Sequence, residues 1–98
     1  MTPASSKPRA GAIGSVAWRT RVRVTGRVRS VRVQPRAGVP TVECTLVDAT
    51  GGIGVVFLGR RRVPGIHPGT RLAVEGMAGC YHDRLAILNP IYEILPPA

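Results

Sequence analysis

The chain has 98 residues, 44% of them hydrophobic, and its 14 basic and 5 acidic residues give a formal net charge of +9. This length allows one domain with a modest core and excludes a larger architecture. No run of about 20 apolar residues is present, so we expect no membrane partner. No apolar segment follows the N-terminal basic residues, so we expect no secretory signal and a cytoplasmic protein. The excess of positive charge favours a polyanionic partner.

Residues 1–14 are rich in Pro, Ala, Ser and Gly and show no periodic pattern, so we interpret them as a mobile tail. The segment 15–20 is expected to form a short helical turn or lead-in anchored by Trp18. We expect the indole ring to plug one end of a barrel, and its alternative role is a platform on which a base stacks. The predicted domain spans residues 15–95, and residues 96–98 form a C-terminal tail.

From Arg21 onward the hydrophobic pattern has a period of two, which is typical of β-strands. Over residues 21–33 one face carries Val22, Val24 and Val28, and the other carries Arg21, Arg23, Arg27 and Arg29. Val31 and Val33 break this phase, so the pattern predicts a β-bulge near Arg29–Ser30 that returns both faces to their sides. A long strand with Gly26 and a bulge coils strongly, which is how a small barrel closes.

Turn residues separate the segments that follow, and we expect strands at 41–48, 53–58, 70–81 and 85–88, with 91–95 lying along the barrel. Residues 34–40 are expected to be a loop, and one helical turn is expected at 60–63. The pattern predicts an all-β fold, a five-stranded OB-fold Greek-key barrel with a short helical connector between strands three and four. An SH3-like barrel is the alternative, although its opening strand is usually shorter.

Catalytic and metal-binding patterns are missing from the sequence. Cys44 and Cys80 are too few for a disulfide framework or a zinc site, and we expect them to be unpaired. His67, His82 and the five carboxylates form no nucleophile–base set and no metal-ligand spacing. We therefore expect no enzymatic activity, no catalytic residue, no metal, no cofactor and no small-molecule substrate.

The positive charge is concentrated in two segments, with seven arginines and no acid in residues 19–36 and four arginines in 60–71. Backbone phosphates attract positive charge, and bases stack on flat side chains. Tyr81 lies beside the hairpin that OB domains use to grip nucleic acid, whereas Phe57 and Tyr92 are expected to pack. The candidate nucleic-acid-binding residues are Arg21, Arg23, Arg27, Arg29, Arg32, Arg60, Arg61, Arg62, Tyr81 and Arg84. The alternative is that these arginines form a solvated face and an exposed loop without a ligand.

Five segments of the chain together resemble a known family. They are Val24-Thr-Gly-Arg-Val28, Leu46-Val-Asp-Ala-Thr-Gly51, Val55-Val-Phe-Leu-Gly59, Pro68-Gly-Thr-Arg-Leu-Ala-Val-Glu-Gly76 and Asn89-Pro-Ile-Tyr-Glu93. In this order and spacing they are similar to the OB wedge domain of RecG-type branch-migrating DNA helicases, and to OB domains found beside tRNA-synthetase and polymerase cores. The resemblance implies an OB fold and binding of DNA at branched or single-stranded sites.

The chain lacks the G-x-x-x-x-G-K-[ST] phosphate loop of a motor domain, so we expect a freestanding module that does not unwind DNA by itself. Our functional prediction is a non-catalytic module that binds single-stranded or branched DNA through its arginine-rich face, with DNA favoured over RNA. A protein partner would supply any enzymatic activity. The alternatives are a protein-interaction OB module whose basic face docks an acidic partner, and binding of RNA or tRNA.

Overall fold

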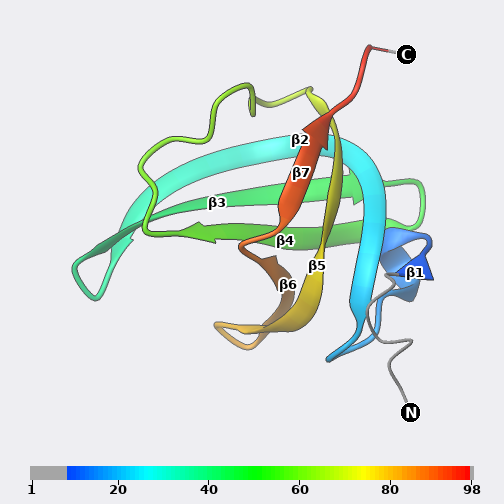
Figure 1. Ribbon diagram of the computed structural model, residues 1–98, viewed down its shortest axis with the longest axis horizontal. Helices are drawn as coiled ribbons and strands as arrows, with labels where there is room; N and C mark the ends of the chain where they lie inside the picture. The colour runs from blue at the N-terminus through cyan, green and yellow to red at the C-terminus, as the bar shows by residue number, and fades with distance from the viewer. Residues whose placement is uncertain (1–8, 98) are drawn as a thin grey trace.

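The computed structural model describes residues 9–97, which form strands and one short 3-10 helix (Figure 1). In chain order the elements are β1 (Arg9–Ala10), η2 (Ile13–Ser15), β2 (Arg21–Arg36), β3 (Val39–Asp48), β4 (Gly51–Leu58), β5 (Arg71–Tyr81), β6 (Arg84–Leu88) and β7 (Ile91–Ile94). No helix in this part of the chain is long and apolar enough to span a bilayer.

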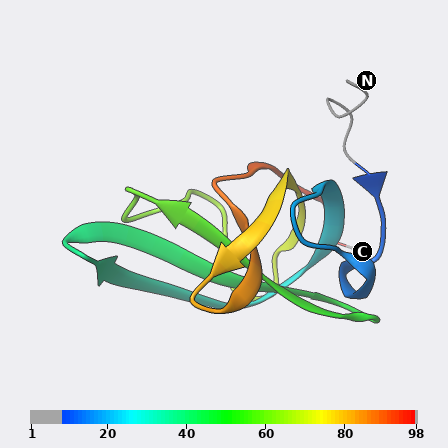
Figure 2. The ribbon, with the colours of Figure 1, turned by 90° about the horizontal axis from the view of Figure 1, so that it is seen from below.

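Five strands close into a ring. β2 pairs with β3 and β3 with β4, both antiparallel; β4 pairs with β6 in parallel; β6 pairs with β5, and β5 pairs back with β2, both antiparallel. β1 adds in parallel to the start of β2, and β7 lies antiparallel beside β5. In both ribbon views β5 crosses β3 and β4 at a steep angle (Figures 1 and 2). The predicted all-β fold with five barrel strands is confirmed.

β2 takes part in both halves of the ring, because its first half pairs with β5 and its second half with β3. The register with β3 shifts between Val28 and Ser30, which makes Arg29 the extra residue of a β-bulge and confirms the predicted one. Gly26 lies at the bend, where a Cβ atom would come within 2.5 Å of the Val47 carbonyl oxygen. A side chain at this position would therefore force the strands apart.

The core lies inside the ring and receives side chains from all five strands. The largest aliphatic side chains that are fully buried are Val24, Val28, Val42, Leu46, Val55, Leu72, Val74 and Ile87. Phe57 is buried as predicted, and its ring meets that of Tyr92 edge-on at a centroid distance of 5.6 Å. Tyr92 also donates a hydrogen bond to the Pro64 carbonyl. The packing role predicted for both rings is therefore confirmed.

The hairpin between β2 and β3 is tighter than predicted. Residues 34–40 were expected to be a loop, but Pro35 pairs with Pro40, and only Ala37 and Gly38 form the turn. Both turn residues have positive φ, 51° and 80°, as a two-residue type I′ hairpin requires. A proline usually ends a strand because it has no N–H to donate to the neighbouring strand. Pro35 and Pro40 lie next to the turn of the hairpin, where that hydrogen bond is not needed.

Ile13, and not Trp18, closes the end of the barrel beside the β3–β4 turn. The Ile13 side chain is 3% exposed, and its backbone N–H donates to Asp48 Oδ2 at 3.0 Å. The Gly14 N–H donates to Thr50 Oγ1 at 2.8 Å, whereas Trp18 is 51% exposed. Ile13 is therefore a core residue, which the interpretation of residues 1–14 as a mobile tail did not allow, and the expectation that Trp18 is the plug is wrong. Residues 1–8 lie outside the described part of the chain.

The connector between β4 and β5, residues 59–70, contains turns and no helix, so the helical turn expected at 60–63 is wrong. Pro64 and Pro68 disfavour a helix, because proline lacks an N–H and restricts the residue before it. Gly65 and Gly69 take φ values of 82° and 94°, which end each turn. Val63 and Ile66, 6% exposed each, fix the connector to the core.

Replacing Ile13 with Ala should lower the free energy of unfolding by about 2–5 kcal/mol, the range for removing a large aliphatic side chain from a core. Ile13→Val should cost about 0.5–1.5 kcal/mol. Trp18→Ala is the control and should cost less than Ile13→Ala, since Trp18 is half exposed. Urea unfolding measures all three variants. A larger loss of unfolding free energy for Trp18→Ala than for Ile13→Ala would show that Trp18 is the plug.

Asp48 should make the stability depend on acid pH. Its carboxylate accepts hydrogen bonds from the Thr50 hydroxyl and from the backbone N–H groups of Ile13, Thr50 and Gly51, which hold the pKa of Asp48 below its ordinary value of 3.8. This stabilisation is fully present above the unfolded pKa and is lost as pH falls through the lower folded pKa.

Asp48→Asn should therefore be less stable than the wild type at neutral pH. On acidification its free energy of unfolding should fall by less than that of the wild type. Urea unfolding at neutral pH and near pH 3 measures the difference. An unchanged acid dependence in Asp48→Asn would contradict this role.

Candidate nucleic-acid interface

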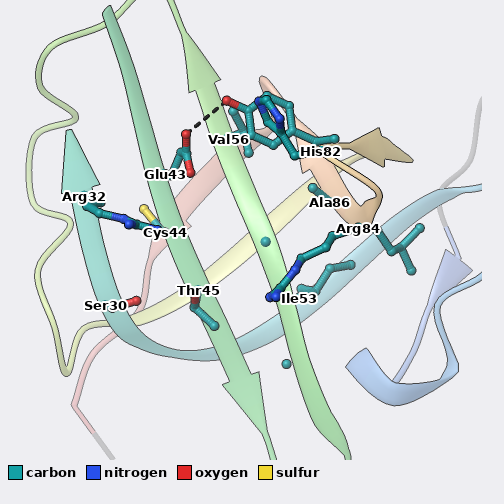
Figure 3. Close-up of a pocket in the computed structure, with 14 residues that line it drawn as sticks. Ser30, Arg32, Glu43, Cys44, Thr45, Ile53, Val56, His82, Arg84 and Ala86 are labelled. Carbon is teal, nitrogen blue, oxygen red and sulfur yellow. Dashed lines mark hydrogen bonds between the residues drawn. The ribbon is translucent and has the colours of Figure 1, made fainter. Parts of the chain in front are cut away.

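A groove of about 720 Å³ crosses the outer face of the barrel over β2, β3, β4 and the β5–β6 hairpin (Figure 3). Strand register places its floor residues in one row, with Ser30 opposite Thr45, Thr45 opposite Gly54, and Gly54 opposite Ala86. These side chains are small or absent, and so is that of Gly52, which also lines the groove. A ligand can therefore approach the sheet backbone closely. We call this site the β3–β4 groove.

Two arginines and one glutamate supply the charge of the β3–β4 groove. Arg32 comes from β2 and lies opposite Glu43 of β3, and Arg84 comes from β6. Figure 3 shows the Arg84 side chain extending across β4 and the Arg32 side chain reaching toward β3. Glu43 Oε2 accepts a hydrogen bond from the Tyr81 hydroxyl at 3.0 Å. The groove lining thus contains two guanidinium groups and one carboxylate, which Tyr81 holds in place.

The hairpin between β5 and β6 places two rings at the groove. The rings of Tyr81 and His82 meet edge-on, with centroids 4.5 Å apart and planes at 89°. His82 and Asp83 have φ values of 50° and 64°, so the hairpin has the two-residue form in which both central residues have positive φ. His82 is exposed and Tyr81 half-buried, which leaves ring surface on which a base can stack.

Arg21 and Arg23 are predicted site residues that lie outside the β3–β4 groove and are paired with acids. Arg21 Nη2 lies 3.3 Å from Glu75 Oε2, and Arg23 contacts both Glu75 Oε1 at 3.6 Å and Glu93 Oε1 at 3.0 Å. The acids come from β5 and β7, far away in the sequence. Pairing with Glu75 and Glu93 offsets the positive charge that made this face a candidate for an anionic ligand.

The other predicted arginines lie in four places. Arg27 donates to the Gly69 carbonyl at 3.3 Å, at the end of the connector, and Arg29 is exposed at the bulge. The Arg60 guanidinium lies 6.0 Å from the centroid of the Phe57 ring. Arg61 and Arg62 line a separate hollow beside the connector. Of the ten candidates, only Arg32, Tyr81 and Arg84 line the β3–β4 groove.

Sequence reasoning missed Glu43, Thr45, His82 and the glycines of the groove floor. The signal for the first two was present, because Glu43 and Thr45 alternate with Val42, Cys44 and Leu46 and must point outward when those residues point inward. No such rule marks His82, since a turn residue gains its role only from what the fold places beside it. Among residues 9–97, no group of three His, Cys, Asp or Glu side chains is placed to hold a metal ion.

No family model matches the sequence, and no curated protein matches it either. Solved structures do match. The OB domain of MM0293 from Methanosarcina mazei aligns with a TM-score of 0.71 and 19% identity over 94% of this chain and 89% of that one. The chain has the OB fold. A chain in the crystal structure of yeast Stn1 and Ten1 aligns with a TM-score of 0.63 and 12% identity over 79% of this chain and 43% of the yeast chain.

These matches support the OB fold, and the finer resemblance to the helicase wedge domain stays a prediction. OB domains bind oligonucleotides and oligosaccharides on the face of their second and third barrel strands, between the loops that follow strands one and four. In this chain those strands are β3 and β4, and the loop after the fourth barrel strand is the Tyr81–Arg84 hairpin. The β3–β4 groove lies on that face.

The two cysteines are free, as predicted, and should differ in reactivity. Cys44 is buried, which raises the pKa of its thiol from 9.0 to about 11, whereas Cys80 is exposed. In mildly alkaline buffer DTNB should react rapidly with the exposed Cys80 of the native protein and with Cys44 only in denaturant. Cys80→Ser should remove the rapid reaction. Equal reactivity of both thiols would contradict the burial of Cys44.

Proposed function

We propose that this chain is a non-catalytic OB module that binds single-stranded nucleic acid in the β3–β4 groove. The observation that carries the proposal is the placement of Arg32, Arg84 and the Tyr81–His82 ring pair around a floor of small side chains. DNA is the favoured ligand because the sequence resembles DNA-binding OB domains. Branched DNA and RNA are the other predicted ligands. Titrating the protein with each of them and with single-stranded DNA distinguishes the three.

The chemistry of the groove fits a single strand. Guanidinium groups pair with phosphates, and a ring surface accepts a base only when that base has left its duplex partner. Thr45 offers a hydroxyl to sugar or base edges, and Gly52 and Gly54 let the strand lie close to β4. With two arginines and two rings the site is small, so we expect modest affinity that depends strongly on salt.

Glu43 restricts where phosphates can lie. Its carboxylate sits in the groove opposite Arg32 and is held by Tyr81, so a phosphate near it would be repelled. We therefore propose that phosphates contact the arginine side chains at the edges of the groove, and that bases face the floor near Glu43. A carboxylate there can accept a hydrogen bond from the exocyclic amino group of cytosine.

The experiment compares two pairs of substitutions that remove the same charge. Arg32→Gln with Arg84→Gln should weaken binding of a labelled single-stranded oligonucleotide and lower the slope of log affinity against log salt by about 1.4, at about 0.7 per phosphate contact. Arg21→Gln with Arg23→Gln is the matched control and should leave the slope almost unchanged, because Glu75 and Glu93 already pair with those arginines. Fluorescence anisotropy at several salt concentrations measures both.

Two further results complete this test. Glu43→Gln should strengthen binding at low salt, since it removes the negative charge that repels the phosphates of the strand. Equal loss of affinity in the two arginine pairs would show that net charge, and not the β3–β4 groove, attracts the oligonucleotide, and would overturn the proposed site. Tighter binding of duplex, forked DNA or RNA than of single-stranded DNA would overturn the proposed ligand.

A further inference from the structure

A second hollow, of about 460 Å³, lies between the connector and β2 and shares no lining residue with the β3–β4 groove. Its wall is aliphatic and is formed by Val31, Val33, Val42, Val63 and Ile66. In Figure 1 the connector runs from the end of β4 to the start of β5 on the side of β2. Hydrogen bonds from Gly59 N–H to the Pro40 carbonyl and from Gly69 N–H to the Val28 carbonyl fix its two ends. We call this site the connector hollow.

The exposure of Val33, which lines the connector hollow, is not explained by the strand pattern. After the bulge at Arg29 it has the same parity as Val31, which packs against the core, yet 55% of Val33 is exposed. Val63 and Ile66 are buried parts of the same wall, whereas the connector leaves Val33 open to solvent. An aliphatic wall that continues from the core to solvent in this way can bury an apolar side chain from another molecule.

The rim of the connector hollow is basic. Arg61, Arg62 and His67 line it, and all three are exposed. Within residues 9–97 no carboxylate lines this hollow, and neither arginine forms an ion pair with a described residue. Arg60, next in the chain, lies against the Phe57 ring and adds to the same positive region. The positive potential here is therefore available to an anionic partner.

The geometry points to the connector hollow as a docking site for an acidic peptide segment of a partner protein. An aliphatic or aromatic side chain of the peptide packs against Val33, and its flanking carboxylates pair with Arg61 and Arg62, whose forked guanidinium groups match carboxylate geometry. A nucleic acid fits less well, because the aliphatic wall would desolvate polar base edges without replacing their hydrogen bonds. This site is independent of the proposed oligonucleotide site.

The probe is a short fluorescein-labelled peptide with a central Leu-Phe pair flanked by aspartates and glutamates. Fluorescence anisotropy measures its binding to the protein. It should bind the full chain, and two matched peptides should bind at least about tenfold more weakly. In one of them Ser-Ser replaces the Leu-Phe pair, and in the other amides replace the carboxylates. Val33→Asp and the pair Arg61→Gln with Arg62→Gln should each weaken the probe by about tenfold or more.

Val39→Asp is the matched control, because Val39 is also an exposed β-strand valine, at 44%, and lies outside the connector hollow. It should leave probe affinity within about twofold. Every substituted residue is exposed, and thermal unfolding confirms that each variant folds. Backbone amide chemical shifts of the wild type give a second measurement: the probe should perturb residues 31–33 and 61–67 and leave residues 81–84 unperturbed.

Several results would overturn the docking site: no binding of the probe by the wild type, equal weakening by Val39→Asp, or shifts centred on residues 81–84. Loss of probe binding in the Arg32→Gln and Arg84→Gln variant would place the peptide in the β3–β4 groove instead. Val33→Asp should leave oligonucleotide affinity within about twofold. If oligonucleotide binding is lost in Val33→Asp while the probe still binds, the hollow belongs to a nucleic-acid site and the peptide proposal fails.

Discussion

The bend of β2 is the constraint on which the rest of the fold depends. One strand has to pair with β5 over its first half and with β3 over its second, and these partners lie at a steep angle to each other. Gly26 and the bulge at Arg29 allow the turn between them, because one removes a side chain that would strike Val47 and the other increases the local twist. Without this bend the five strands would form an open sheet with two exposed edges.

The same bend decides which arginines share a surface. In the sequence Arg21, Arg23, Arg27 and Arg29 alternate regularly with valines and predict one continuous basic face. In the folded chain the first two lie beside β5 and β7, where Glu75 and Glu93 pair with them. Arg32 follows the bulge and faces the β3–β4 groove. Alternation gives the side of a strand on which a residue lies, but the neighbours across the sheet decide whether its charge remains available.

The barrel strands and the bulge could be predicted from the sequence because each leaves a local signal, a period of two or a break in it. The errors have two physical origins. Ile13 has no periodic pattern around it and becomes a core residue only through hydrogen bonds between its neighbourhood and the β3–β4 turn. The connector resembles one turn of helix in composition, but Pro64, Gly65, Pro68 and Gly69 impose turns that Val63 and Ile66 fix to the core. Ile13 is thus placed by contacts with residues distant in the sequence, whereas the turns of the connector follow from its own prolines and glycines.

The pairing of β2 with β5 also has a consequence for how the chain reaches its folded state. During synthesis β2, β3 and β4 emerge in order and can form antiparallel hairpins at once, whereas the first half of β2 has no ring partner until β5 is made, since Arg21 pairs with Met77. Closing such a long loop is entropically slow, and β6 must then enter between β4 and β5. A nascent chain halted before β5 would expose the edge of β2 together with Val22 and Val24, which makes the interval before ring closure the stage most open to aggregation or to capture by a chaperone.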